Sequence, residues 1–166
     1  MSSTLHFVDD ASTDQTPDII KKYVNLDHRI HSVRHDFNRK LPAALNTGFA
    51  RAKGNYFTWI SDDNCYRPNA IEYMLNYLCK HPDIGVVYTD FSKICVRKDQ
   101  RVYVKVSPPE MLACRNAIQA SFLYRRKVHE ALNGYNEDLF LVEDYDFWLR
   151  ASMLFKFKPI HQDLYI

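Results

Sequence analysis

The chain has 166 residues, of which 46% are hydrophobic and 25% charged, and its formal net charge is +2. This composition is typical of one soluble globular domain, and the near-neutral charge gives no electrostatic reason to expect a nucleic-acid partner. No apolar run approaches the roughly 20 residues needed to cross a bilayer, and the first residues lack the order of a signal peptide. We therefore expect a cytoplasmic protein without a transmembrane segment.

Strand-like and helix-like patterns alternate over the first half of the chain. The expected strands lie at residues 5–8, 29–34, 56–60 and 86–89. The expected helices between them lie at residues 16–24, 42–52 and 68–80, with Pro17 and Pro42 in first turns. This alternation predicts an α/β fold with a mainly parallel, open sheet and helices on both faces.

The second half changes character and predicts a partly mixed sheet. Residues 94–97 and 101–106 read as a hairpin, and residues 118–125 as a further strand. A polar loop then leads to a helix at 143–155. There is no internal repeat and no obvious linker, so we expect a single domain over residues 1–166.

The cysteines and histidines carry no metal-binding signal. Cys65, Cys79, Cys95 and Cys114 form no Cys-x-x-Cys pair. Reduced, buried thiols are therefore expected in place of a structural zinc site. The seven histidines show no ligand spacing and are expected on the surface or in the core.

Charged side chains follow each of the first three expected strands. They are Asp9 and Asp10 after the first, Arg39 and Lys40 after the second, and Asp62 and Asp63 after the third. Ligands of open α/β sheets bind beyond the carboxyl ends of the strands, so we expect these pairs at one edge of one sheet. There the carboxylates would hold a divalent metal ion and the cations would meet phosphate or base. Taken singly, an aspartate after a strand is more often a turn or capping residue.

Three ordered motifs between residues 7 and 150 resemble family 2 glycosyltransferases. FVDDASTD at residues 7–14 is similar to the VDDGSTD signature of that family. ALNTGFARAKGNYFTWISDDN at 44–64 resembles the block that leads to its metal-binding aspartates, and VEDYDFWLR at 142–150 resembles its Glu-Asp motif. The spelling DDNCYRPNAIEYML is closest to the spore-coat polysaccharide synthesis type, although Ile60 stands where an aspartate often occurs.

The resemblance implies an inverting enzyme of GT-A fold that transfers a sugar from a nucleotide-diphosphate donor. It also implies an apolar strand and helix ahead of the VDDGSTD segment, which this sequence lacks. Relatives of this fold place that strand beside the one ending at Asp9. We therefore expect the isolated chain to be incomplete, to bind nucleotide weakly and to turn over slowly.

The resemblance also implies a donor site. Its nucleotide-binding residues would be Asp9, Asp10, Arg39, Lys40 and Asp62. Either aspartate of the first pair would accept a hydrogen bond from base or ribose, and either cation would lie near the base. Asp62 would approach the ribose, and Asp63 would hold Mg²⁺ or Mn²⁺ against the diphosphate, with Asp62 as a second metal ligand.

By the same resemblance, Asp144 is the general base that takes the proton of the acceptor hydroxyl, and Glu143 orients it or touches the acceptor. From the residues alone, the favoured reading is that acids in the first turn of a helix complement the helix dipole and need no other reason. Trp148 is expected in the core, and Asn46 is expected to tie its helix to neighbouring backbone.

Donor and acceptor stay broad at this point. UDP is the expected nucleotide because it is common in the family, and the acceptor is a glycan, a lipid-linked glycan or a protein. A lipid acceptor would bring the chain to the inner face of a membrane. The rival readings are a truncated, non-catalytic nucleotide-sugar-binding relative and a receiver-type phosphoacceptor domain that binds Mg²⁺.

Overall fold

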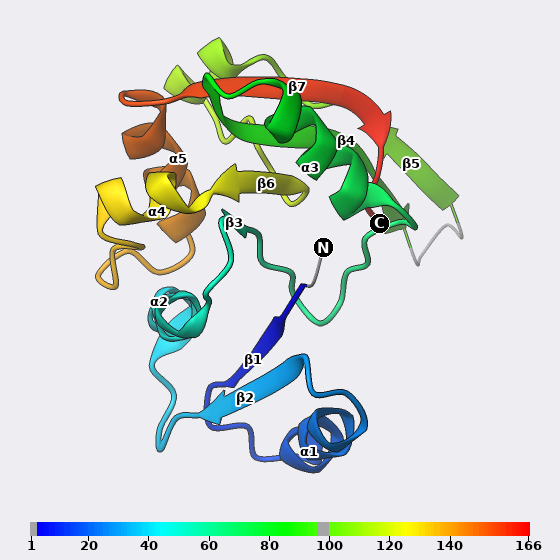
Figure 1. The fold of residues 1–166 in the computed structure, drawn as a ribbon, viewed down its shortest axis with the longest axis vertical. Coiled ribbons are helices and arrows are strands. Elements are labelled where there is room, and N and C mark those ends of the chain that lie inside the picture. The colour runs from blue at the N-terminus through cyan, green and yellow to red at the C-terminus, as the bar shows by residue number, and fades with distance from the viewer. Residues whose placement is uncertain (1–2, 96–99) are drawn as a thin grey trace. The chain divides into compact units, whose positions relative to one another are not determined.

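The computed structural model describes residues 3–95 and 100–166 and shows an α/β chain (Figure 1). Residue contacts divide the chain into two compact units. The first comprises Met1–Gly54 and Gly134–Asp146, and the second comprises Asn55–Asn133 and Phe147–Ile166. Each unit has a sheet of its own.

The first unit is built on two parallel strands. β1 (Leu5–Asp9) pairs with β2 (Ile30–Arg34) in a register that runs from Leu5 opposite Ile30 to Asp9 opposite Arg34. α1 (Thr16–Leu26) packs against β2, and α2 (Lys40–Arg51) packs against β1 (Figure 1). This strand–helix order follows the sequence pattern and confirms the expected elements in this part of the chain.

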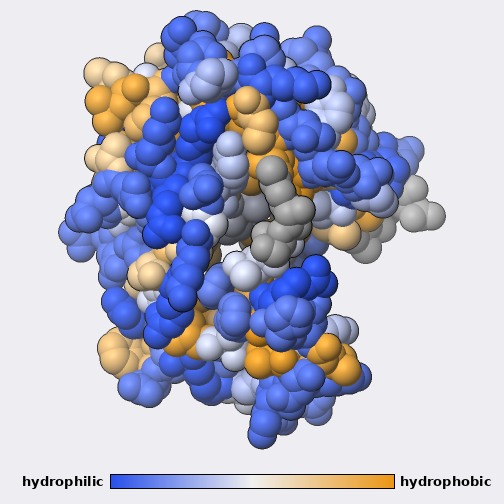
Figure 2. Space-filling model, in the orientation of Figure 1, coloured by the Kyte–Doolittle hydropathy of each residue, from blue (hydrophilic) through white to orange (hydrophobic). Residues whose placement is uncertain are grey.

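The two helices of this unit are buried to different extents. α2 buries small and apolar residues, among them Ala43, Ala44 and Phe49, and approaches β1 closely at Gly48. A Cβ atom at Gly48 would lie 3.2 Å from Val8 Cγ2, which is tighter than ordinary contact. α1 has no fully buried residue. Apolar surface, coloured orange, is visible beside hydrophilic surface in this part of the first unit (Figure 2).

The second unit holds a mixed sheet. Its described strands are β3 (Tyr56–Phe57), β4 (Ile84–Cys95), β5 (Gln100–Val104), β6 (Phe122–Arg125) and β7 (Lys156–Asp163). They follow the order β3-β6-β4-β5, and β7 pairs with β4. The β4–β7 pair is parallel, whereas β3–β6, β4–β6 and β4–β5 are antiparallel. The mixing expected for the second half of the chain is confirmed.

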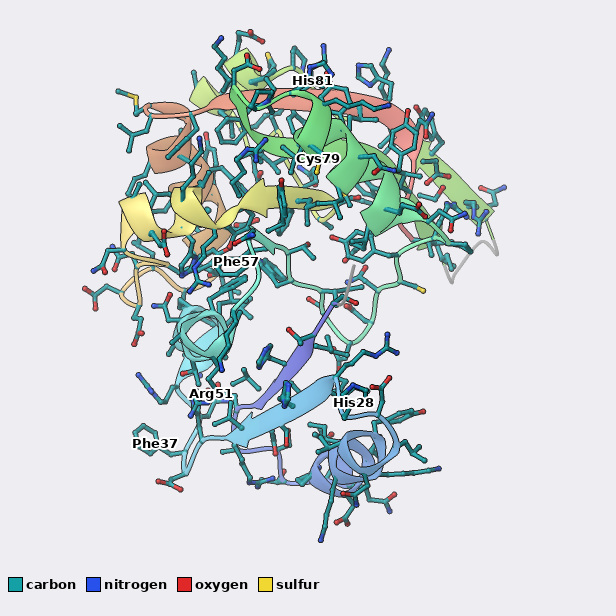
Figure 3. All side chains as sticks on the ribbon, viewed as in Figure 1. His28, Phe37, Arg51, Phe57, Cys79 and His81 are labelled. Carbon is teal, nitrogen blue, oxygen red and sulfur yellow. The ribbon has the colours of Figure 1, made fainter. Side chains whose placement is uncertain are left out.

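Helices and aromatic rings fill the core of the second unit. Its helical segments are α3 (Ala70–Lys80), the 3-10 turn η2 (Pro109–Ala113), α4 (Arg126–Leu132) and the part of α5 (Glu143–Ser152) from Phe147 on. Met74 and Leu78 of α3 pack on Val87, Leu123 and Ile160 of the sheet. Cys79 and His81, labelled in Figure 3, lie at the C-terminal end of α3.

The strand carrying the second acidic pair is shorter than expected. The pattern predicts residues 56–60, but only Tyr56 and Phe57 form β3, and their ladder with β6 stops at the Phe57–Tyr124 pair although β6 continues to Phe122. Trp59, beyond β3, packs on the sheet, since the centre of its ring lies 5.8 Å from that of Phe122 in an edge-on contact. Because β3 pairs with β6 and β1 with β2, the expectation that all three strands share one sheet is wrong for the described pairing.

Two elements were not expected from the sequence. β7 contains Pro159 within a charged run, which demotes a strand prediction. The proline is tolerated because β7 is an edge strand of the described sheet, with β4 as its partner. α4 follows β6 without a loop. Its seven residues are too few to show a helical spacing of apolar residues distinct from that of the preceding strand. Of the expected hairpin, residues 96–97 lie outside the described residues.

The described thiols correct another expectation. Cys65, Cys79 and Cys114 are free, as expected, but all are exposed and none is a core residue. Within residues 3–95 and 100–166, no helix is long and apolar enough to span a membrane.

Candidate functional site

Asp9 ends β1 in an internal ion pair. Its Oδ2 accepts a 2.5 Å hydrogen bond from Arg34 Nη1, and its Oδ1 accepts one of 2.9 Å from the Ser12 N–H. Arg34 is the register partner of Asp9 on β2, so the pairing of the strands itself brings the two charges together. The Asp9 side chain is 3% exposed. Its oxygens therefore serve to close the turn after β1.

Asp10 follows β1 in the chain, and its side chain contacts the N-terminus of α2. Its two carboxylate oxygens each accept a 2.8 Å hydrogen bond, from the backbone N–H of Arg39 and of Lys40. His35 Nδ1 lies 2.7 Å from Asp10 Oδ1, and His35 Nε2 lies 2.9 Å from Thr47 Oγ1. A carboxylate only accepts, so His35 Nδ1 carries the proton of this contact. Asp10 of the first acidic pair thus meets both residues of the basic pair through their backbone amides.

These contacts set the ionisation of Asp10. Burial opposes the charged form, but the hydrogen bonds from the Arg39 backbone and the His35 ring outweigh it and hold the pKa of Asp10 below its ordinary value. The free N–H groups of a helix N-terminus also favour an anion. Asp10 is therefore a carboxylate at neutral pH, with 20% of its side chain exposed.

The side chains of Arg39 and Lys40 reach the loop of residues 133–140. Arg39 Nη2 lies 3.2 Å from Glu137 Oε2, and Lys40 Nζ lies 5.5 Å from the centre of the Phe140 ring. Both cations are exposed. Phe37, in the loop between β2 and α2, points away from the ribbon (Figure 3) and is 68% exposed.

Asn46 ties α2 to this same loop, as expected. Its Oδ1 accepts a 2.8 Å hydrogen bond from the Tyr135 N–H, and its Nδ2 donates one of 2.9 Å to the Tyr135 carbonyl. Nδ2 also lies 3.0 Å from Glu137 Oε1. The Asn-x-Gly segment of the sequence motif therefore fastens the segment that leads toward Glu143 and Asp144.

The second acidic pair lies in the second unit, in a turn that we call the acidic turn, residues 61–64. The Asn64 N–H donates to the Ser61 carbonyl at 3.3 Å, which closes the turn. Asp62 and Asp63 at its tip are both exposed. Asn64 Nδ2 donates a 2.5 Å hydrogen bond to Asp63 Oδ1. Exposure lets water solvate two neighbouring like charges, so no internal cation is needed to hold them there.

The acidic turn offers only part of a metal coordination shell. No group of three or more His, Cys, Asp or Glu side chains in the described part of the chain is arranged to hold a metal ion. Mg²⁺ is commonly held by one or two carboxylates, with waters and substrate phosphates completing the shell. Asp62 and Asp63 fit that pattern, because they present exposed carboxylates without an enclosing cage.

Glu143 and Asp144 open α5 in contrasting surroundings. Glu143 is 5% exposed, and its Oε2 is buried without a hydrogen-bond partner among the described residues. Asp144 is half-buried, and its Oδ1 accepts a 2.7 Å hydrogen bond from the Tyr145 N–H. Asp144 is thus the more accessible of the two.

Sequence reasoning missed the partners that hold the first acidic pair. Arg34, His35 and Thr47 were not singled out, although Arg34 and His35 directly follow the core of the second expected strand. The signal was positional: a charge at the end of β2 faces a charge at the end of β1 in a parallel pair. His35 is buried, in agreement with the expectation of surface or core for the histidines.

Replacing Asp10 with asparagine is expected to destabilise the chain by about 1–2 kcal/mol, the usual cost of losing a capping carboxylate. The amide has one acceptor oxygen, and its NH₂ would face a backbone N–H donor. Urea unfolding at pH 7 measures the loss. Because the pKa of Asp10 is lowered on folding, its stabilisation is present above the ordinary value and fades as pH falls below it. The difference between wild type and Asp10→Asn should therefore shrink in acid.

Asp36→Asn is the matched control, since Asp36 is exposed in the same loop. A loss no greater for Asp10→Asn than for Asp36→Asn at pH 7 would contradict the capping role.

Comparisons with known proteins agree on one family. The model of glycosyl transferase family 2 matches residues 3–133. An uncharacterized glycosyltransferase of Rickettsia felis is 31% identical over 140 residues, and the putative glycosyltransferase EpsE of Bacillus subtilis is 31% identical over 149 residues. These alignments cover 78% and 86% of this chain but 23% and 53% of the relatives. The chain therefore spans about half or less of these curated relatives.

Two solved structures show the fold. The TarS 1-349 structure from S. aureus, in complex with UDP, has a TM-score of 0.80 at 16% identity and covers 98% of this chain and 50% of that one. The mannosyltransferase PcManGT from Pyrobaculum calidifontis, in complex with GDP-Man and Mn²⁺, has a TM-score of 0.70 at 18% identity and covers 96% of this chain and 45% of that one. The GT-A fold expected from the motifs is confirmed. With a family model that matches most of its residues, the chain belongs to glycosyl transferase family 2.

Proposed function

We propose that this chain serves the metal-dependent transfer of a sugar from a nucleotide-diphosphate donor to an acceptor hydroxyl, with inversion at the anomeric carbon. The observation that carries the proposal is the exposed acidic turn, which lies inside the span matched by the family model. The proposal assigns residues 1–166 to one glycosyltransferase domain whose two compact units carry different roles.

Asp63, with Asp62 beside it, would hold Mg²⁺ or Mn²⁺ at the acidic turn. The ion, when bound, supplies positive charge against the diphosphate leaving group. Asp62 would also approach the ribose. Support comes from the exposure of both carboxylates and from the Mn²⁺ named with GDP-Man in the PcManGT structure.

Apart from Asp62, the proposed nucleotide-binding residues belong to the first unit. Between the two aspartates of the first pair we favour Asp10 over Asp9, because the Asp10 side chain is 20% exposed and that of Asp9 is 3% exposed. Arg39 and Lys40 keep exposed cations beside it that can meet base or phosphate. We propose UDP as the nucleotide, the one named in the TarS complexes.

Asp144 would act as the general base toward the acceptor hydroxyl. It is half-buried in the first turn of α5, so part of its side chain is open to an acceptor. Glu143 would orient it from a buried position, since one Glu143 oxygen lacks a partner among the described residues. The acceptor is a glycan, a lipid-linked glycan or a protein.

Thermal unfolding with UDP, GDP and dTDP, each with and without Mn²⁺, tests the proposal. We expect a stabilisation by UDP that requires Mn²⁺ and amounts to about 1.4 kcal/mol at ten times Kd. Asp63→Asn should abolish the Mn²⁺-dependent part, because an amide is a weak ligand for a hard cation. Asp18→Asn, which removes an exposed carboxylate of α1, should keep it. Stabilisation by UDP that is equal with and without Mn²⁺, or unaffected by Asp63→Asn, would refute the metal role.

A further inference from the structure

The chain just after the acidic turn is fastened to the last residues. The Cys65 N–H donates to the Ile166 carbonyl at 2.7 Å, and the Ile166 N–H returns a hydrogen bond of 2.9 Å to the Cys65 carbonyl. The Arg67 N–H donates to the Leu164 carbonyl at 3.0 Å. Two residues beyond Asp63, the backbone therefore enters a short antiparallel pairing, within which Tyr66 faces Tyr165.

The same terminal residues are bound to the sheet. The Ser92 N–H donates to the Tyr165 carbonyl at 2.9 Å, and the Leu164 N–H donates to the Asp90 carbonyl at 3.1 Å. Ser92, the donor, and Asp90, the acceptor, both belong to β4, the central strand of the second unit. The residues that hold the acidic turn are thus themselves held by a rigid element.

Tyr66 joins the two sides of the turn. Its hydroxyl lies 2.7 Å from Thr58 Oγ1, which precedes the turn, and donates at 3.2 Å to the Phe122 carbonyl of β6. Burial raises the pKa of Tyr66 to about 12, so the hydroxyl keeps its proton. The Tyr66 hydroxyl therefore links the chain segment before the acidic turn, at Thr58, to the segment after it, which contains Tyr66 itself.

One side-chain cluster completes this attachment, and we call it the anchor cluster, Arg67, Ser92 and Asp163. Arg67 Nη2 and Ser92 Oγ each donate a 2.7 Å hydrogen bond to Asp163 Oδ2, and Arg67 Nη2 lies 3.3 Å from Ser92 Oγ. The Arg67 and Asp163 side chains are 25% and 29% exposed. The cluster links the segment after the turn to β4 and to the end of β7.

Two polar atoms of the anchor cluster form no hydrogen bond within the described residues. Arg67 Nε and Asp163 Oδ1 are buried atoms without a hydrogen-bond partner among the described residues. Removing one member of a partly buried ion pair leaves the other charge poorly compensated. Loss of the charge at Arg67 or at Asp163 therefore leaves the other, partly buried charge without its ionic partner.

We propose that Arg67 and Asp163 are positioning residues that hold the acidic turn in the geometry that receives the metal ion and the diphosphate. This inference rests on the proposed function of Asp62 and Asp63. Arg67 is four residues past Asp63. Its side chain binds Asp163, and its backbone N–H binds the Leu164 carbonyl. An exposed turn that must place two carboxylates on one ion gains affinity when its base is held still, since less ordering remains to be done on binding.

Titration of Mn²⁺ into the full chain at saturating UDP, followed by electron paramagnetic resonance of the free ion, measures the effect. We expect Arg67→Lys and Asp163→Asn each to raise the Kd for Mn²⁺ roughly five- to tenfold, below the 10–100-fold typical of groups that touch a metal ligand. Arg125→Lys is the matched control. Arg125 donates to the carbonyls of Ile84 and Leu78, so the variant weakens the same unit without touching the turn.

The outcomes separate the possibilities. Lower thermal stability with an unchanged Kd for Mn²⁺ in Arg67→Lys and Asp163→Asn would show a merely structural role and overturn the inference, as would an equal rise in Kd for Arg125→Lys. Absence of Mn²⁺ binding to the wild-type chain with UDP would refute the proposed function itself. If Asp163→Asn does not fold, Ser92→Ala decides: a two- to threefold rise in Kd supports the anchor cluster, and none overturns it.

Discussion

Asp144→Asn is expected to lower the rate of sugar transfer by about 10²–10⁴-fold, the contribution typical of a general base. An asparagine has nearly the shape of aspartate and can still accept the Tyr145 N–H at its oxygen, but it cannot take a proton. The loss should therefore fall on turnover. The rate of UDP release from UDP-GlcNAc, the donor named with TarS, and the UDP affinity of the same samples measure the two effects separately.

Glu143→Gln provides the comparison for Asp144→Asn. Glu143 is buried, so Glu143→Gln should lower turnover less than Asp144→Asn does. It should also lower the free energy of unfolding less than Asp144→Asn does, because one Glu143 oxygen already lacks a partner among the described residues. A loss of turnover in Asp144→Asn that is matched by an equal loss of UDP affinity would contradict the base assignment. So would a Glu143→Gln variant that is the more impaired of the two.

Trp148→Ala should cost about 3–5 kcal/mol of unfolding free energy, the usual range for truncating a buried tryptophan. Trp148 is fully buried. Its ring meets the rings of Phe122 at 4.8 Å, Phe147 at 5.1 Å and Tyr124 at 5.8 Å, so its removal opens a cavity among aromatic side chains. Urea unfolding followed by circular dichroism measures the loss.

Trp148→Phe tests the packing argument. The Trp148 Nε1–H is buried without an acceptor among the described residues, so phenylalanine removes an unsatisfied donor while it keeps an aromatic ring. Its cost should be about 1–2 kcal/mol, smaller than that of alanine. Met153→Ala, at a position 83% exposed, should stay within about 0.5 kcal/mol. A Trp148→Ala loss no larger than that of Met153→Ala would show that the ring does not hold the core.

Much of the fold follows from local pattern. The spacing of apolar residues predicts α1 to α3 and the strands between them, and each of these elements is present with shifted ends. The predictions for Asn46 and Trp148 are confirmed for the same reason. Each depends on what its own segment requires, a backbone tie for a polar amide on α2 and a core position for an indole on α5.

β7 and the extent of β3 could not be predicted in this way. A strand forms where a partner strand offers a ladder, and this is a property of residues far away in the chain. Pro159 argues against β7 locally, yet β4 accepts it as an edge partner. The run at 58–60 argues for a longer β3, yet the ladder with β6 stops at the Phe57–Tyr124 pair.

The sequence by itself determined the family, the α/β class and the positions of the acidic residues, because motif spelling and hydrophobic period are local properties. Only the tertiary structure decided which partners those acids have. Asp10 receives backbone N–H groups 29 and 30 residues away, and Arg67 meets Asp163 at a separation of 96 residues. Such contacts depend on how strands pair and helices pack, so the residue types in each segment do not specify them.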